Sequence, residues 1–267
     1  MSAGPVSAGA VTAPTTVRRR VAHVMGMPVS LALRGRHSGD DATDAAWQEV
    51  LEVLHEVDRV FSTYRPDSVV SRLDRGELHL EDCPPEVHEV LALGERARVE
   101  SHGAFGVRRP GPDGRRVLDP SGVVKGWAVE RAARVLETLA DTDFCLSAGG
   151  DLVCRTRLAD SPPWRIGVED PADPQRVVAV VPVRNGAVAT SGTAHRGAHI
   201  VDARTGEVPT GTGSVTVVGP DLVWADIDAT AAYALGSGAL PWLRTRPGRS
   251  GLVVTRSGAV EVFGSAS

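Results

Sequence analysis

The sequence contains little lysine, few aromatic residues and no long apolar run. Aromatic residues make up 4% of the chain, and only one of its 29 basic residues, Lys125, is a lysine. No apolar run approaches the roughly 18 residues of a membrane-spanning helix, so we expect no membrane insertion. The formal net charge of -4 excludes the broad basic field with which proteins bind nucleic acid, so no nucleic-acid partner is expected.

The cysteines and the N-terminal residues indicate the setting of the protein. Cys83, Cys145 and Cys154 are odd in number and lack the spacing of a metal site or disulfide framework. We interpret them as reduced thiols, which are typical of a cytoplasmic protein.

Residues 1–17 are small and polar and lack the apolar segment of a signal peptide, so we predict a flexible tail. The length of 267 residues suits one large domain or two small ones, and we expect a single domain over residues 18–267.

Periodic patterns along the chain predict both helices and strands. Helices are grouped with hairpins and do not alternate with single strands, which favours an α+β fold with a largely antiparallel, mixed sheet. Asp41 or Thr43 is the expected N-cap of the first helix, and Asn185-Gly186 predicts a hairpin between residues 177–183 and 187–190. The first helix is expected to end at residue 61, and further helices are expected at 84–103, 122–139, 225–235 and 240–243. A loop is expected at 106–120. Strands are expected at 18–33 (interrupted at 25–28), 144–146, 151–155, 164–168, 177–183, 187–190, 214–218, 252–255 and 259–263.

Two glycine-containing motifs predict close contact between the backbone and a ligand. Ser121-Gly122-Val123-Val124-Lys125-Gly126 opens a predicted helix, where free N–H groups, the helix dipole and an ammonium favour an anion. Ala148-Gly149-Gly150-Asp151 lies between two predicted strands, and paired glycines let a ligand approach the backbone. The alternatives are a glycine-rich helix start with an exposed Lys and a simple tight turn.

A third motif combines hydroxyls with a histidine. Thr190-Ser191-Gly192 is followed by His199-Ile200-Val201-Asp202. His199 could be a base, a donor to phosphate or a core histidine with satisfied hydrogen bonds. Residues 202–206 also fit an Asx-type turn.

The fourth motif places a carboxylate and a hydroxyl on one helix face. Asp226 and Thr230 are four residues apart, so their oxygens lie one turn apart. Such a pair can bind a hard cation such as Mg²⁺, with waters and phosphate completing its shell. The alternative is that Asp226 caps the helix and Thr230 packs against its neighbours. Together the four motifs indicate nucleotide or pyrophosphate chemistry.

The order of these motifs resembles that of the ApbE family, the FAD:protein FMN transferases. The resemblance extends from about residue 21 to residue 262. It rests on Met25-Gly26, Phe61-Ser62-Thr63-Tyr64 with Asp67-Ser68, Gly103-Ala104-Phe105, Ser121-Gly122-Val123-Val124-Lys125-Gly126, Gly149-Gly150-Asp151, Thr190-Ser191-Gly192, His199-Ile200-Val201-Asp202 with Thr205-Gly206, and Ala225-Asp226 with Thr230.

The resemblance implies an α+β domain with an FAD-binding cleft and a bound Mg²⁺. Such proteins transfer FMN from FAD to a threonine hydroxyl of an acceptor protein and release AMP. It implies that Asp226, Thr230 and a backbone carbonyl near Val124 hold the Mg²⁺ and that Lys125 acts in catalysis. The attacking threonine needs a base, and His199 or a carboxylate such as Asp202 could serve. The residues implied to line the FAD site are Met25, Gly26, Tyr64, Gly149, Gly150, Asp151, Thr190, Ser191 and His199.

The sequence also departs from the family pattern. Met27 stands where many relatives have Thr, and His102 and Gly106 stand where a common pattern has Asp. Many relatives are exported lipoproteins, whereas this sequence shows no export signal, so a cytoplasmic setting is expected. Two alternatives to the transferase stay open: an FAD pyrophosphatase that gives FMN and AMP, and a non-catalytic FAD-binding carrier protein.

Overall fold

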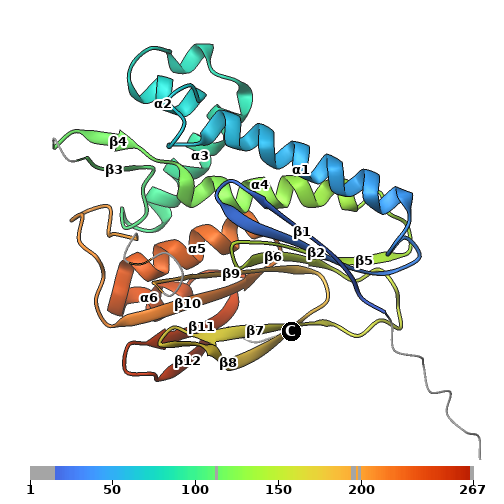
Figure 1. Cartoon of the computed structure of the whole chain (residues 1–267). Coiled ribbons are helices and arrows are strands. Elements are labelled where there is room, and N and C mark those ends of the chain that lie inside the picture. The colour runs from blue at the N-terminus through green and yellow to red at the C-terminus, as the bar shows by residue number, and fades with distance from the viewer. Residues whose placement is uncertain (1–15, 112–113, 194–196, 198–199, 265–267) are drawn as a thin grey trace, which may run out of the picture.

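An antiparallel sheet of eight strands forms the centre of the protein (Figure 1). The computed structural model describes residues 16–111, 114–193, 197 and 200–264. Within them the strand order is β1-β2-β5-β6-β9-β10-β11-β12, and every neighbouring pair is antiparallel. The strands are β1 (Arg18–Val24), β2 (Met27–Gly35), β5 (Thr142–Ala148), β6 (Asp151–Arg155), β9 (Gly186–Gly192), β10 (Thr212–Gly219), β11 (Ser250–Thr255) and β12 (Val260–Phe263).

Helices cover one face of this sheet. In α1, residues Trp47, Val50, Leu54 and Val57 recur at helical spacing and are buried, because this stripe faces the core. The helix α4 lies between α1 and α5 (Figure 1). Within the described residues, no helix combines the length and the apolar character needed to cross a membrane. The helices are α1 (Asp41–Phe61), α2 (Val69–Asp74), η1 (Leu80–Asp82), α3 (Pro85–Glu100), α4 (Ser121–Leu136), α5 (Leu222–Leu235), η2 (Gly236–Gly238) and α6 (Ala239–Leu243).

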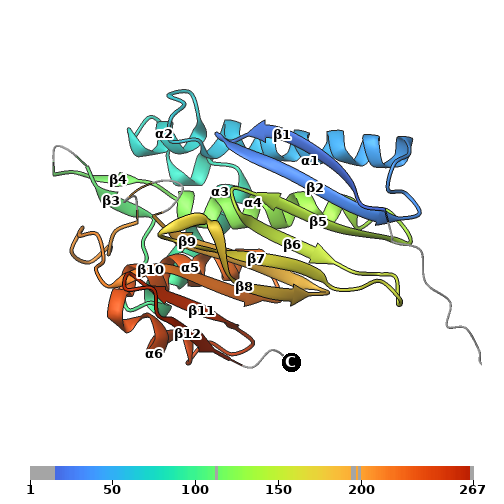
Figure 2. The ribbon, with the colours of Figure 1, turned by 60° about the horizontal axis from the view of Figure 1, so that its bottom comes forward.

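Two small hairpins complete the fold. The hairpin of β7 (Trp164–Asp170) and β8 (Asp173–Val183) lies on the face of the sheet opposite the helices (Figure 2). It packs there through Val168, which shares an apolar cluster with Leu252 and Val254 of β11. The second hairpin, β3 (Arg108–Pro110) and β4 (Arg116–Leu118), follows α3 and leads into α4. The expected α+β class with a largely antiparallel sheet is confirmed.

The predicted hairpin at Asn185-Gly186 is wrong. The strand before it, β8, pairs with β7, whereas the strand after it, β9, pairs with β6 and β10 in the main sheet. The Asn185 side chain accepts a hydrogen bond from the Thr156 backbone N–H at 2.9 Å. This bond holds the connection between β8 in the small sheet and β9 in the main sheet. Burial decides the pairing, because β9 is almost wholly buried and most of β8 is exposed or half-buried.

Three other local predictions need correction. The first helix is capped by Asp40, whose carboxylate accepts the Thr43 N–H, and neither Asp41 nor Thr43 is the cap. The interrupted strand at 18–33 is a true hairpin, with Met25 (φ 55°) and Gly26 (φ 69°) as its two-residue turn. The expected loop at 106–120 contains the strands β3 and β4. These strands of three residues are too short to show a periodic pattern.

A buried hydroxyl in α5 offers a test of the core. Tyr233 is fully buried, and its hydroxyl has no hydrogen-bond partner among the described residues. We expect Tyr233→Phe to leave the free energy of unfolding unchanged or to raise it by about 1 kcal/mol, because an unsatisfied buried hydroxyl is removed. Urea unfolding of both proteins measures the difference. A loss of more than about 1 kcal/mol would mean that the hydroxyl has a partner.

Candidate active site

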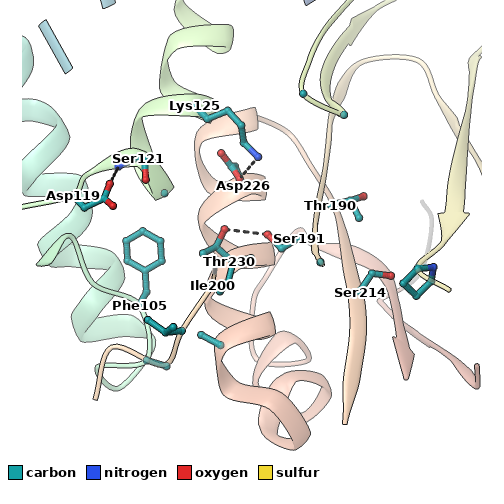
Figure 3. A pocket seen from close by; sticks show the side chains of 18 of the residues that line it. Phe105, Asp119, Ser121, Lys125, Thr190, Ser191, Ile200, Ser214, Asp226 and Thr230 are labelled. Atoms are coloured by element: carbon teal, nitrogen blue, oxygen red, sulfur yellow. Dashed lines mark hydrogen bonds and ion pairs between the residues drawn. The ribbon is translucent and has the colours of Figure 1, made fainter. Parts of the chain in front are cut away.

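A cavity opens where the N-terminal part of α4 meets α5 and the ends of β9 and β10 (Figure 3). Its volume of about 270 Å³ far exceeds the roughly 10–15 Å³ that one water molecule needs. Seven of the residues predicted to act in catalysis, to bind FAD or to hold the metal line it. They are Lys125, Gly149, Gly150, Thr190, Ser191, Asp226 and Thr230.

The single lysine bridges two buried carboxylates at the wall of this cavity. Its Nζ lies 2.5 Å from Asp151 Oδ2 and 3.3 Å from Asp226 Oδ1. The other oxygen of Asp151 accepts the Thr190 backbone N–H at 3.0 Å, which links the bridge to β9. The three charged side chains together carry one net negative charge when all are ionised. The alternative of an exposed Lys at a helix start is therefore excluded.

A close contact between α4 and α5 positions Asp226. The Gly126 N–H donates to Asp226 Oδ2 at 3.0 Å. A Cβ on Gly126 would lie 2.8 Å from the Leu222 carbonyl oxygen and 2.9 Å from the Asp226 Cβ. Only glycine lets the two helices approach this closely. The cap of α5 is Asp221, so the alternative role of Asp226 as a helix cap is also excluded.

Burial controls the charge of Asp226. Loss of contact with water raises the pKa of Asp226 to about 7, the nearby Lys125 ammonium opposes this rise, and the Asp151 carboxylate adds to it. A carboxyl group poised in this way gains its negative charge readily when a further cation arrives.

Hydroxyl groups continue the polar wall beyond Asp226. Thr230 lies one turn further along α5, and its hydroxyl is 3.1 Å from the Ser191 hydroxyl of β9 (Figure 3). Among the described residues, no three His, Cys, Asp or Glu side chains gather as a metal site. The oxygens of Asp226 and Thr230 form a different donor set, one carboxylate and one hydroxyl, which suits a hard cation that keeps several waters.

The sequence resemblance implies a third oxygen, a backbone carbonyl near Val124. Val124 is buried and does not line the cavity, whereas Gly122, two residues earlier in α4, does. The assignment of this carbonyl to Val124 stays a prediction.

The Gly149-Gly150 turn approaches the cavity from the sheet. Both glycines have positive φ, 58° and 95°, which the turn between β5 and β6 requires. The Gly149 N–H donates to the Pro28 carbonyl at 3.1 Å, so this turn lies beside the β1–β2 hairpin. Met25 and Gly26, in the turn of that hairpin, do not line the cavity.

Two other predicted site residues, Tyr64 and Asp202, do not line the cavity. Tyr64 is 96% exposed and lies outside the cavity lining. The Asp202 carboxylate is held by Arg204 at 2.5 Å, and these hydrogen bonds lower the pKa of Asp202. Because a lowered pKa weakens a general base, this geometry does not favour Asp202 in that role. His199 lies outside the described residues.

The cavity also contains residues that the sequence reasoning did not select for the site. Arg109 and Asp119 form an ion pair of 2.7 Å at one end, beside Phe105. At the other end lies Ser214, which is 4% exposed and whose hydroxyl has no hydrogen-bond partner among the described residues (Figure 3). No local sequence signal marks Ser214, because it lies within an ordinary apolar strand.

The position Gly106 also lies at the cavity. A Cβ there would be 3.1 Å from the Ala203 Cβ, so the Ala203 side chain lies where a side chain at position 106 would begin. The chain has Gly106 where the common family pattern has Asp, and the Ala203 side chain lies where that Asp side chain would begin.

Comparison with known proteins identifies the family. A sequence model of the ApbE family matches residues 25–109 and 111–253. The chain belongs to the ApbE family. Curated relatives named FAD:protein FMN transferase include those of Escherichia coli K12, 29% identical over 151 residues, and of Rhodobacter capsulatus, 32% identical over 155 residues.

These alignments are partial. They cover 53% and 54% of this chain, but only 43% and 29% of the respective relatives. The matched part thus spans less than half the length of either relative.

Solved structures confirm the ApbE fold. The ApbE protein of Thermotoga maritima superposes with a TM-score of 0.79 at 21% identity, over 93% of this chain and 97% of that one. The apo form of the Pseudomonas stutzeri flavinyl transferase ApbE gives the same TM-score at 23% identity, over 93% and 96% of the two chains.

Proposed function

We propose that this protein transfers FMN from FAD to a threonine hydroxyl of an acceptor protein and releases AMP, with Mg²⁺ as the metal. The observation that carries the proposal is the convergence of Lys125, Asp226, Thr230 and the Gly149-Gly150 turn on one cavity. A pyrophosphate needs an ammonium, a cation site and close backbone approach, and this cavity offers all three. Membership of the ApbE family and the names of the relatives support the same activity.

The oxygen donors of the cavity suit Mg²⁺. Asp226 and Thr230 would hold it through a carboxylate and a hydroxyl, with a backbone carbonyl near Val124 as a third oxygen. The bound ion would neutralise charge on the pyrophosphate and on the departing AMP. The assignment of these ligands is part of the proposal.

The residues of the chain then have separate tasks. The Lys125 ammonium offsets the negative charge of the phosphates while Asp151 holds it in place, and the glycine turn allows the phosphates to approach. In the transfer, the threonine oxygen bonds to the phosphorus of the FMN half. The bond from that phosphorus to the bridging oxygen breaks, and AMP leaves with that oxygen. The threonine proton passes to a base. Of the two candidates from the sequence, the ion pair with Arg204 disfavours Asp202, so we propose His199.

Release of AMP is the direct test. Purified protein is incubated with FAD and Mg²⁺, with and without a candidate acceptor domain, and AMP and the mass of the acceptor are followed. We expect AMP together with an acceptor heavier by FMN less one water, and no AMP after EDTA treatment. AMP without a modified acceptor would indicate an FAD pyrophosphatase, and bound FAD without AMP would indicate a carrier. The cytoplasmic setting expected from the sequence stays a prediction.

The hydroxyl of Ser214, which has no partner in the described part of the chain, predicts a contact with FAD. A buried hydroxyl at a cavity wall gains a hydrogen bond when a ligand fills the cavity, and such a bond contributes about 1 kcal/mol. We expect Ser214→Ala to weaken FAD binding about fivefold in a fluorescence titration. The matched control is Thr156→Val, which removes another buried hydroxyl without a partner, outside the cavity lining. Equal affinities for FAD in both variants would remove Ser214 from the binding site.

A further inference from the structure

A second hollow lies next to the cavity, between α3, the β3–β4 hairpin and the loop that carries Arg204. We call it the arginine groove; its charged lining residues are Glu95, Arg98, Arg108, Arg116 and Arg204. Phe105 and Gly106 line both the groove and the cavity, so the two hollows meet there. Gly106 has no side chain, and the side chains beside it at this junction include those of Phe105 and Ala203.

The lining of the groove is strongly cationic, although the whole chain has a net charge of -4. Arg98 pairs with Glu95 at 2.7 Å and Arg204 pairs with Asp202 at 2.5 Å. Arg108 and Arg116 are exposed, and within the part of the chain that the structure describes neither lies at ion-pair distance from an acidic side chain. The charge of Arg108 acts at longer range on Asp74, whose pKa it helps to lower. Arg116 donates instead to the Arg108 carbonyl at 2.6 Å.

The side chains of the β3–β4 hairpin point alternately to its two sides, one towards the groove and the other towards the cavity. In its register Arg108 faces Leu118 and Pro110 faces Arg116, so Arg108 and Arg116 lie on the same side of the hairpin. Arg109 lies on the other side, where it lines the cavity and pairs with Asp119. Arg108 and Arg116, which have no carboxylate partner among the residues that the structure places, therefore serve the groove and not the cavity.

We propose that the arginine groove binds an acidic segment of the acceptor protein, next to the threonine that receives FMN. This inference rests on the proposed function. The acceptor threonine must enter the cavity, whereas the acceptor residues on either side of it must lie outside. The groove meets the cavity at Phe105 and Gly106, so it is placed to bind those flanking residues. Unpaired guanidinium groups favour carboxylates, which they bind in a bidentate manner, and they steer an acidic partner towards the site.

The experiment measures binding without turnover. The probe is a fluorescein-labelled peptide with a central Thr flanked by Asp and Glu, and the control peptide has Asn and Gln in their places. The test variant is Arg108→Glu with Arg116→Glu. The matched variant, Arg18→Glu with Arg19→Glu, makes the same change of charge on exposed β1. FAD binding is titrated in all three proteins by flavin fluorescence.

We expect the wild-type protein and the β1 variant to bind the acidic peptide equally, and more tightly than the neutral one. The groove variant should bind the acidic peptide at least about tenfold more weakly, with FAD affinity unchanged. Binding of the acidic peptide should also weaken as salt rises.

Three results would overturn the inference. They are equal affinity of the groove and β1 variants for the acidic peptide, equal affinity of the wild type for both peptides, and displacement of the acidic peptide by inorganic phosphate at matched ionic strength. The last would assign the groove to a phosphate group. A protein that binds FAD but not the acidic peptide contradicts the groove alone, whereas a failure to bind FAD or release AMP contradicts the proposed function.

Discussion

Replacement of Asp226 by Asn is expected to reduce AMP release from FAD by about 10³-fold or more. The change removes the only carboxylate of the proposed Mg²⁺ ligands, and a metal supplies several kcal/mol of charge stabilisation to the reaction. An amide oxygen still accepts the Gly126 N–H, which Asp226 Oδ2 accepts at 3.0 Å, so the protein should stay folded. Initial rates of AMP release at several Mg²⁺ concentrations, together with thermal unfolding, measure the effect.

Asp221→Asn provides the matched control, because it makes the same chemical change at the start of the same helix. Asp221 accepts the Trp224 N–H as the cap of α5, and Asn caps helices about as well as Asp. Asp221 is also absent from the cavity lining. Full activity in Asp226→Asn, or an equal loss in both variants, would contradict the metal assignment.

Replacement of Gly126 by Ala is expected to damage both stability and activity. The added Cβ would lie 2.8 Å from the Leu222 carbonyl oxygen and 2.9 Å from the Asp226 Cβ. Because backbone atoms cannot rotate away, α4 and α5 must move apart. We expect a loss of about 2 kcal/mol in the free energy of unfolding and a fall of roughly 4–8 °C in Tm. AMP release should fall as well, because Asp226 would move relative to Lys125.

The control is Gly238→Ala, at a glycine whose added Cβ would come no closer than 3.7 Å, to Leu235 Cβ. Its Tm should match that of the wild type within the error of the measurement. If Gly126→Ala behaves like Gly238→Ala in both Tm and AMP release, the close contact of α4 and α5 does not position Asp226.

Features encoded within one helix were predictable from the sequence. The spacing of Asp226 and Thr230 predicted oxygens on one face of a helix, and α5 places both at the cavity. The apolar stripe of α1 and the glycines beside Lys125 were recognised in the same way. A helix of known period places residues i and i+4 together whatever surrounds it, so these predictions needed no knowledge of the rest of the fold.

Strand partners were predictable only in part. The last two strands, β11 and β12, were both expected from the sequence, and they pair with each other across a short turn. The hairpin predicted at Asn185-Gly186 does not form, because β9 pairs with β6 and β10 in the main sheet, where its side chains are buried. A two-residue turn signal describes only local backbone preference, and long-range burial outweighs it.

Local patterns in the amino-acid sequence were enough to predict the α+β class, the helices that carry Lys125 and Asp226, and the glycine turn at Gly149-Gly150. The bridge of Lys125 between Asp151 and Asp226 and the ion pair of Asp202 with Arg204 became visible only in the folded structure. The same holds for Ser214 in the cavity wall and for the groove that Arg108 and Arg116 share. Gly126 and Asp226 are 100 residues apart, and contacts over such separations depend on how the sheet and helices pack.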